Sequence, residues 1–307
     1  MTTATSDLSP DLLGVEPAAG VSRWAAAYEL AKPRLNLLVL VTTAVGFFAA
    51  AGWAGTVGSA LLFLNCLVGT ALTAAGAGAL NQWIERDVDA RMPRTRGRPL
   101  PANALSPAFA FGFGAILGLG GTLWLWLSVN LLAAALALAT LLIYVAIYTP
   151  LKSRTPLCTI VGAVPGAIPP VIGVAGANGP MWPLGVGLFA ILFCWQMPHF
   201  FGLATLYRDD YRRGGLRMLP GEPNGQRRTS RQAILWSALL LPASLLPALS
   251  PGIGWLYAIA AVALGLWFFV ASTRMARGGR AEAKRLFLTS IAYLPLLLLA
   301  LCLDRLL

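Results

Sequence analysis

Long apolar runs separated by short polar segments make up most of this chain. Each run is near the ~20 residues that an α-helix needs to cross the hydrocarbon core of a bilayer. Nine runs can be marked, at residues 35–53, 59–83, 104–127, 129–148, 156–176, 182–206, 233–250, 252–272 and 286–304. This pattern predicts an all-α polytopic membrane protein with about nine transmembrane helices.

The basic residues lie almost entirely in every second connecting segment. Segments 1–34, 84–103, 149–155, 207–232 and 273–285 contain 3, 5, 2, 7 and 5 lysines and arginines, which is 22 of the 23 in the chain. The exception is Arg305. Because basic loops remain on the cytoplasmic side of a membrane, we expect the N-terminus and the long loops in the cytoplasm. The C-terminus is then expected on the outer side of a multi-pass cell membrane protein.

The overall composition agrees with a membrane protein. Of the 307 residues, 57% are hydrophobic and 11% are charged, against about 25% charged in soluble domains. Basic cytoplasmic loops explain the net charge of +11, so no nucleic-acid partner is expected. Residues 1–22 contain three acids and no base, which indicates a disordered tail ahead of one transmembrane domain at 23–307. The four cysteines have no metal-ligand spacing and are expected to be buried apolar residues.

The third polar segment begins "NQWIERDVDARMPRTRGRPL" (81–100) and contains a regular row of oxygen ligands. Asn81, Glu85 and Asp89 are four residues apart, so a helix places them on one face over about 12 Å. Such a row suits a hard, partly hydrated cation, which indicates Mg²⁺. The alternative is a solvated helix end whose acids pair with neighbouring arginines.

A second acidic pair, Asp209 and Asp210, lies in "LYRDDYRRGGLRMLP" (206–220) on the same side of the membrane. Asp209 with Arg213 is also an ordinary ion pair of a helix, so a purely local interpretation stays open. Two acid clusters flanked by arginines nevertheless favour a shared site for a metal–diphosphate complex. Acids would hold Mg²⁺, the metal would bridge phosphate oxygens, and arginines would neutralise the remaining charge.

A third loop on this side, "YTPLKSR" (148–154), places Tyr148 four residues before Lys152. Both side chains can contact a phosphate, although an interfacial tyrosine beside bases that reach toward water is the simpler interpretation. The candidates for diphosphate binding are Arg94, Arg98, Lys152 and Arg154.

The single histidine, His199, lies with Gln196 inside the sixth apolar run. Polar residues at membrane depth are functional candidates, and the alternative is a hydrogen bond between helices. His199 is a candidate haem-iron ligand or acceptor-positioning residue. We expect one continuous helix in which Gln196, His199, Leu203, Leu206 and Asp210 form a stripe. His199 then lies roughly 16 Å from Asp210, too far to share a metal. In the fifth run, Pro165, Pro169 and Pro170 predict a bent helix.

Together these motifs resemble the UbiA superfamily of intramembrane prenyltransferases. Its Asn-x₃-Asp-x₃-Asp motif is matched by Asn81, Glu85 and Asp89, its Tyr-x₃-Lys element by Tyr148 and Lys152, and the acids of its second motif by Asp209 and Asp210. Within the superfamily, residues 84–101, 148–173 and 195–220 are similar to the haem-farnesylating family, the protohaem IX farnesyltransferases.

The chain departs from these patterns at a few positions. Glu85 replaces the usual Asp, which keeps a carboxylate but lengthens its reach. Leu206 stands where quinone-prenylating relatives often carry an additional Asp. Cys158 and Arg217 stand where Asn and Pro are expected, which bears on the shape of the acceptor pocket.

The resemblance implies a UbiA-like bundle around a central cavity that opens to the cytoplasm. It implies Mg²⁺-dependent transfer of a farnesyl group from farnesyl diphosphate to the 2-vinyl group of haem B, in haem O and haem A biosynthesis for terminal oxidases. Asn81, Glu85, Asp89, Asp209 and Asp210 would bind the metal, and His199 and Gln196 would lie on the haem side. A haem A synthase is a plausible partner. The alternatives are a related enzyme with an aromatic acceptor and a transporter or haem-delivery protein.

Overall fold

The computed structural model describes residues 22–52 and 56–307, so the predicted N-terminal tail lies outside the described residues apart from Ser22. Regular structure in the described part is entirely helical. The α-helices are α1 (Arg23–Leu30), α2 (Pro33–Ala51), α3 (Val57–Asp89), α4 (Pro107–Ser128), α5 (Leu131–Leu142), α6 (Thr149–Leu151), α7 (Cys158–Ala167), α8 (Pro169–Gly176), α9 (Val186–Leu206), α10 (Arg208–Arg213), α11 (Gly225–Leu245), α12 (Trp255–Arg274) and α13 (Arg280–Leu306). The all-α prediction is therefore confirmed.

All nine predicted spans are present in the described residues, as helical stretches long and apolar enough to cross a membrane. Three of them extend beyond the apolar runs: α3 continues to Asp89, α11 begins at Gly225 and α13 begins at Arg280. The extensions are rich in arginine, which is a good helix former. The apolar pattern marks the part of a helix that lipid surrounds, and the helix itself continues into the polar region.

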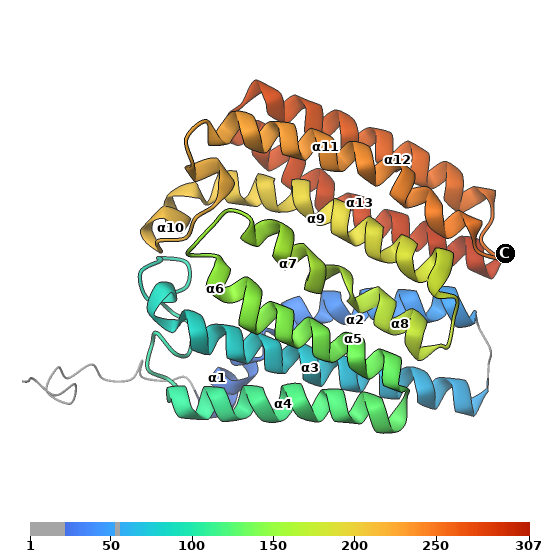
Figure 1. Cartoon of the computed structure of the whole chain (residues 1–307), viewed down its shortest axis with the longest axis horizontal. Helices are drawn as coiled ribbons and strands as arrows, with labels where there is room; N and C mark the ends of the chain where they lie inside the picture. The colour runs from blue at the N-terminus through green and yellow to red at the C-terminus, as the bar shows by residue number, and fades with distance from the viewer. Residues whose placement is uncertain (1–21, 53–55) are drawn as a thin grey trace, which may run out of the picture.

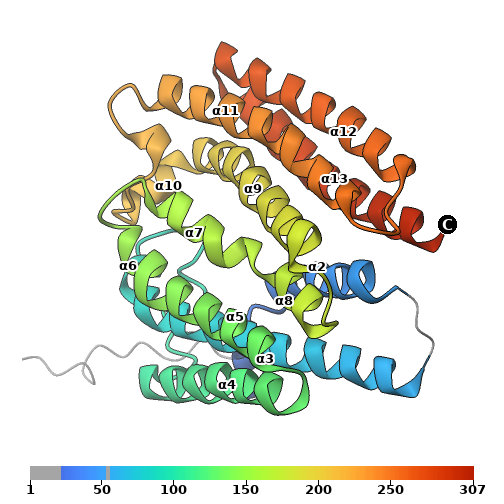
Figure 2. The same cartoon turned by 45° about the vertical axis from the view of Figure 1, so that its right-hand side comes forward.

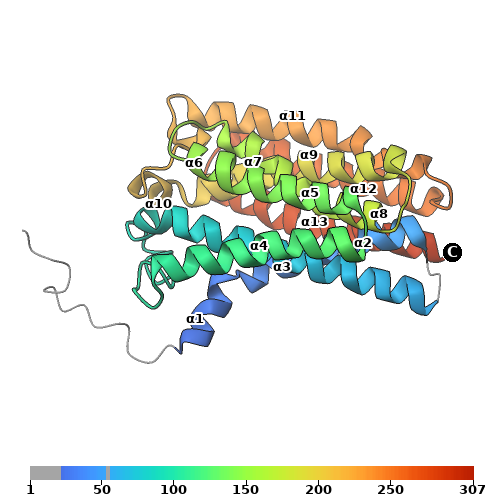
Figure 3. The ribbon, with the colours of Figure 1, turned by 60° about the horizontal axis from the view of Figure 1, so that its bottom comes forward.

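The long helices run side by side, so the bundle has two distinct ends (Figure 1). The short helices α6 and α10 lie at one end, and the C-terminus lies at the opposite end. Helices α9, α11, α12 and α13 form one group, helices α3, α4 and α5 form another, and α2, α7 and α8 lie between them (Figures 1 and 2). Helix α1 is inclined away from the bundle near the end that carries α10 (Figure 3).

Prolines divide the fifth span into α7 and α8, as the sequence predicts. Pro165 lies inside α7, and Pro169 and Pro170 open α8. The second half packs very closely on α2, because a Cβ atom at Gly173 would overlap the carbonyl oxygen of Thr43. Small residues thus allow the backbones of α2 and α8 to touch.

The length of α3 places its polar end outside the apolar layer. Its 33 residues extend about 50 Å, whereas the hydrocarbon core is about 30 Å thick. Glu85 and Asp89 occupy the final turns of this helix, close to the connecting segments at the end that carries α6 and α10.

The contact between α3 and α4 gives a direct test of this packing. A Cβ atom at Gly76 would overlap the backbone of Gly118, whereas a Cβ atom at Gly112, also on α4, would have nothing within 4 Å. We expect Gly76→Ala to lower the free energy of unfolding by about 1–3 kcal/mol through overpacking. Gly112→Ala should leave it unchanged or raise it by up to about 1 kcal/mol, because alanine favours helix. Thermal unfolding in detergent measures both, and equal effects would contradict the close approach.

Candidate active site

A polar cavity of about 180 Å³ lies beside the last turns of α3. Five parts of the chain that are distant in sequence contribute to it: the α1–α2 junction, α3 with the loop after it, the end of the fourth span, α10 and the loop after α10. The lining residues are Lys32, Asn81, Glu85, Asp89, Met92, Arg94, Arg98, Tyr144, Tyr148, Lys152, Tyr211, Leu216 and Met218. We call this cavity the polar pocket.

The predicted row on α3 forms one wall of the polar pocket. Asn81, Glu85 and Asp89 all line it and are only 1%, 8% and 1% exposed. Burial of two carboxylates is costly unless opposite charge compensates them. A base contacts each member of the row: Lys32 Nζ lies 2.5 Å from Asn81 Oδ1, Lys152 Nζ lies 2.8 Å from Glu85 Oε1, and Arg98 Nη1 lies 2.6 Å from Asp89 Oδ2.

Hydrogen bonds orient the first member of the row. The Asn81 side-chain amide donates to Thr149 Oγ1 at 3.0 Å, and the Thr149 hydroxyl donates to the carbonyl oxygen of Tyr144 at 2.8 Å. Since the hydroxyl proton is used in the second bond, Thr149 can only accept from Asn81. The carbonyl oxygen of the Asn81 side chain is thereby turned toward Lys32.

The Tyr-x₃-Lys element enters the pocket from a π-helical segment, Ile143–Tyr148. Such segments are rare and occur frequently at functional sites. The ammonium of Lys152 lies 4.5 Å from the centre of the Tyr148 ring, close enough for a cation–π contact. Gly162 leaves the space for that ring, since a Cβ atom there would overlap it.

Lys152 remains charged in this setting. Burial disfavours the charged ammonium, but Tyr148 and the Glu85 carboxylate more than offset it, so the pKa of Lys152 lies above its ordinary value. The charged ammonium is therefore favoured beside the α3 row.

Lys32 is a pocket residue that the sequence pattern does not single out. It joins α1 to α2, and its backbone is in the left-handed region with φ of 50°, which costs energy for a residue other than glycine. Burial, together with repulsion from Arg98 and Lys152, lowers the pKa of Lys32 to about 7. In sequence it looks like any basic residue that precedes a transmembrane helix, and no spacing distinguishes it.

Two tyrosines of the pocket were also absent from the predicted site. Tyr144 precedes Tyr148 by four residues, and their ring centres are 5.3 Å apart, so an extension of the Tyr-x₃-Lys spacing by one step would have found it. Tyr211 of α10 also lines the pocket, and in the sequence it stands between the two acids and the arginines. No spacing in the sequence indicates that Tyr211 faces the pocket.

The second acidic pair lies apart from the first. Neither Asp209 nor Asp210 lines the polar pocket; Asp209 is exposed, and Asp210 lies 3.8 Å from Arg213. The expected continuous helix through residue 210 is wrong, because α9 ends at Leu206 and the backbone at Tyr207 leaves the helical region before α10 begins. Within residues 22–52 and 56–307, no three His, Cys, Asp or Glu residues gather as metal ligands. A metal role for these two acids remains a prediction.

Three of the four predicted diphosphate residues line the polar pocket. Arg94, Arg98 and Lys152 do so, and Arg94 stacks over the Tyr207 ring at 5.5 Å. Arg154 is exposed and outside the lining residues. The fourth pocket base is Lys32, so the cavity contains four bases and two carboxylates.

His199 and Gln196 lie on α9, away from the polar pocket. The Gln196 amide donates to the carbonyl oxygens of Leu192 and Ala163, which fits a purely structural role. His199 Nδ1 lies 2.7 Å from the hydroxyl of Ser290, and that hydroxyl donates its proton to the Phe287 carbonyl. The hydroxyl must then accept from Nδ1, which leaves the lone pair on Nε2.

The two unusual residues Cys158 and Arg217 meet in space. The Cys158 thiol lies 4.0 Å from the Arg217 carbonyl oxygen. The Arg217 backbone N–H donates to the Lys152 carbonyl oxygen at 2.8 Å, and its guanidinium makes two hydrogen bonds to Glu222. These contacts tie the loop after α10 to the loop that carries Lys152.

The donor set of the α3 row fits a magnesium ion. All three side chains offer oxygen, and Mg²⁺ commonly uses one or two carboxylates while water and substrate phosphate complete its shell. Oε1 of Glu85 is buried and lies 2.8 Å from Lys152 Nζ, and a carboxylate oxygen has a second lone pair beside the one that faces the ammonium. This oxygen keeps the capacity to bind a further cation.

Comparisons with known proteins identify the family of this chain. The UbiA prenyltransferase family model matches residues 39–294. The protoheme IX farnesyltransferase of Solibacter usitatus (strain Ellin6076) is 44% identical over 90% of this chain and 97% of its own length. The protoheme IX farnesyltransferase of Anaeromyxobacter sp. (strain Fw109-5) is 45% identical over 90% of this chain and 92% of its own length.

Solved structures support the fold at lower identity. A digeranylgeranylglyceryl phosphate synthase structure superposes with a TM-score of 0.78 at 17% identity, covering 93% of this chain and 99% of the other. A structure of a UbiA homolog from Archaeoglobus fulgidus bound to DMAPP and Mg²⁺ superposes with a TM-score of 0.65 at 17% identity. The match covers 90% of this chain and 98% of the other. At such low identity these likenesses establish the helical bundle and nothing finer.

The pair of Lys152 and Glu85 should show strong coupling in a double-mutant cycle. Glu85→Gln or Lys152→Met alone leaves one buried charge without its partner. We expect each to cost roughly 1–3 kcal/mol of unfolding free energy, below the about 3–5 kcal/mol of a fully enclosed pair because the pocket admits water. The double variant should cost less than the sum. Thermal unfolding in detergent without divalent metal measures the cycle, and additive losses would contradict the ion pair.

Proposed function

The chain belongs to the UbiA prenyltransferase family, and we propose that this prenyltransferase moves a farnesyl group from farnesyl diphosphate to the 2-vinyl group of haem B, giving haem O and diphosphate. The relatives named protoheme IX farnesyltransferase support this acceptor and donor, since they match about nine tenths of the chain at 44–45% identity. Cleavage at C1 of the donor gives an allylic cation, the vinyl group attacks it, and water completes the side chain.

The observation that supports the proposal best is the mixture of charges in the polar pocket. Four bases and two carboxylates line a cavity of about 180 Å³. Carboxylates alone would suit a cation, and bases alone would suit an anion. A metal-bound diphosphate needs both, and its negative charge answers the excess of bases.

Asn81, Glu85 and Asp89 are the residues that would hold Mg²⁺, and Asp209 and Asp210 are proposed to complete the site from α10. Magnesium bound there would supply positive charge against the leaving diphosphate. Lys152, Arg94 and Arg98 would contact the diphosphate oxygens. Tyr148 would hold Lys152 through the face of its ring and can donate a hydrogen bond to the same group.

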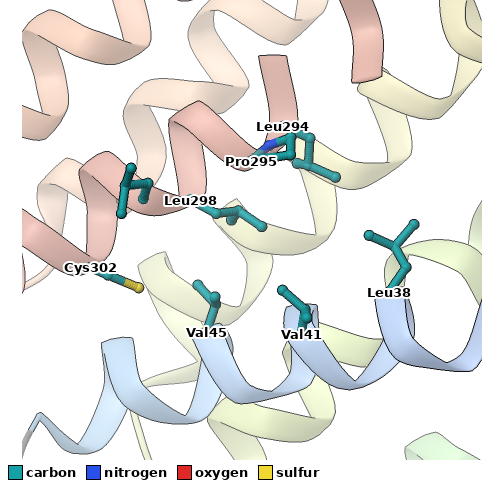
Figure 4. A pocket seen from close by; sticks show the side chains of 8 residues that line it. Leu38, Val41, Val45, Leu294, Pro295, Leu298 and Cys302 are labelled. Carbon is teal, nitrogen blue, oxygen red and sulfur yellow. The ribbon is translucent and has the colours of Figure 1, made fainter. Parts of the chain in front are cut away.

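The farnesyl chain requires apolar space near the pocket. A cavity of about 240 Å³ between α2 and α13 provides it, and Figure 4 shows Leu38, Val41 and Val45 of α2 facing Leu298 and Cys302 of α13. These α2 residues follow Lys32 by 6 to 13 positions, which is about 9–20 Å along the helix axis. We propose that this groove receives the apolar chain and shields the reacting end from water.

His199 is the proposed contact on the haem side. With its proton on Nδ1, the lone pair of Nε2 is free to ligate iron or to accept a hydrogen bond. Gln196 lies one turn away and is proposed to line the same region. The Ser290 hydroxyl would fix the orientation of the imidazole, as neighbouring groups do for ligating histidines.

In the cell, the proposed reaction belongs to haem O and haem A biosynthesis for terminal oxidases. The basic end of the bundle, which carries the polar pocket, would face the cytoplasm. Farnesyl diphosphate is water-soluble at one end and apolar at the other, so a pocket at a membrane surface suits it. A haem A synthase that accepts the product is a proposed partner.

The product itself provides the decisive test. The full chain is expressed in membranes of a host that lacks haem O, with Mg²⁺ and farnesyl diphosphate supplied. Reversed-phase chromatography and mass spectrometry should show a more apolar haem, heavier by one farnesyl group and one hydroxyl group, because the added water loses a proton. Asp89→Asn should reduce this product at least about 100-fold, because the carboxylate acts on the leaving group's charge.

Arg154→Gln is the matched control, since Arg154 belongs to the same basic end but lies outside the polar pocket. It should keep most of the activity. Unchanged haem B with a prenylated 4-hydroxybenzoate appearing instead would move the acceptor to the aromatic class. Unchanged haem B with no prenylated product in folded protein would argue against the transferase mechanism.

The apolar groove predicts a selective defect in donor binding. Val45→Trp fills the space between α2 and α13, so the KM for farnesyl diphosphate should rise about 10- to 100-fold, at about 0.8 kcal/mol for each methylene group displaced. Inhibition by inorganic diphosphate should be unchanged, because the polar pocket is untouched. Val262→Trp on the lipid-facing side of α12 is the control and should leave both values unchanged.

A further inference from the structure

A second groove lies at the α12–α13 hairpin, outside the polar pocket. It has a volume of about 440 Å³ and two chemically different ends. Lys284 and Arg285 line one end, and Leu288 and Ala292 line the other, with Trp267 of α12 as the facing wall. None of these residues belongs to the proposed prenyl-transfer site. We call it the hairpin groove.

The groove follows one face of α13. Residues 281, 284 or 285, 288 and 292 recur every three or four positions, so they lie above one another along the helix. The distance from Lys284 to Ala292 is about 12 Å along the axis. Trp267 and Leu288 are 44% and 52% exposed, so the apolar part is open to the surroundings of the bundle. A ligand that fits must have one polar end and an apolar body of at least that length.

The polar end is strongly basic. The segment 274–285 contains Arg274, Arg277, Arg280, Lys284 and Arg285 and a single acid, Glu282. Glu282 lies 3.4 Å from Arg285 and neutralises part of that charge. No ion pair involves Lys284 within residues 22–52 and 56–307. The bases therefore present a net positive charge where the apolar groove begins.

We propose that the hairpin groove binds an acidic phospholipid from the leaflet on the basic side of the membrane. The lipid phosphate would contact Lys284 and Arg285, and one acyl chain would lie along Leu288 and Ala292 against Trp267. Basic pockets between transmembrane helices bind acidic headgroups in this way. The long side chains of lysine and arginine reach the headgroup level while their methylene groups pack on apolar surface.

A lipid bound there would connect the two helices of the hairpin. Its chain would contact α12 through Trp267 and α13 through Leu288, and its phosphate would offset repulsion among the bases. Ligands that bind only the folded state stabilise it by mass action. The proposal thus predicts that an acidic phospholipid raises the thermal stability of the full chain more than a zwitterionic one does.

The test compares two double variants that remove the same charge. Purified full-length protein in detergent is titrated with phosphatidylglycerol or phosphatidylcholine and followed by native mass spectrometry and by thermal unfolding. In the wild type, phosphatidylglycerol should bind at least about 10-fold more tightly than phosphatidylcholine. Lys284→Ala with Arg285→Ala should abolish that preference. Arg274→Ala with Arg277→Ala removes two bases of the same segment that do not line the groove, and the preference should remain.

A third variant tests the apolar half without any change of charge. Ala292→Phe fills the groove and should weaken phosphatidylglycerol binding, since the acyl chain loses its space. Equal losses in the two double variants would overturn the proposal in favour of diffuse electrostatic attraction. Equal binding of both lipids to the wild type, or an equal thermal shift from inorganic phosphate alone, would also overturn it.

Discussion

Compensation of buried charge at the end of α3 is the constraint on which the rest of this structure depends. Glu85 and Asp89 are almost fully buried, and an isolated carboxylate in such a place would be very costly. The bases that pair with them come from two separate parts of the chain, Arg98 from the loop after α3 and Lys152 from the end of the fourth span. Lys32 of the α1–α2 junction donates to the neighbouring side-chain amide of Asn81. Charge pairing therefore holds together the connecting segments that close one end of the bundle.

The same pairing limits how the proposed substrates can enter. With four bases and two carboxylates, the polar pocket already carries excess positive charge, and a divalent ion arriving alone would add to it. A metal-bound diphosphate brings compensating negative charge. The carboxylates could then bind the metal, and the bases that now pair with them could bind phosphate oxygens instead. Burial and repulsion already disfavour the charged form of Lys32, and an arriving anion would favour it. Under the proposed function, charge balance couples ion and donor binding.

Much of this arrangement could be predicted from the sequence because it depends on spacing within one helix. The apolar runs gave the nine spans, and the four-residue spacing gave the row Asn81, Glu85 and Asp89. Contacts between segments that are distant in the sequence could not be predicted in the same way. Lys32 looks like an ordinary basic residue before a transmembrane helix, and the break at Tyr207 has no proline or glycine to mark it. On the helix that follows the break, Tyr211 lines the polar pocket, whereas Asp209 and Asp210 beside it do not.

The two unusual residues show how a local structure changes the interpretation of a sequence. Cys158 and Arg217 were expected to bear on the acceptor pocket, but the structure places them beside each other at the loop that carries Lys152. Proline at position 217 would have no N–H, whereas arginine donates one to the Lys152 carbonyl oxygen. Its guanidinium also binds Glu222. Arg217 therefore adds backbone support behind a base of the polar pocket, on the diphosphate side of the proposed reaction.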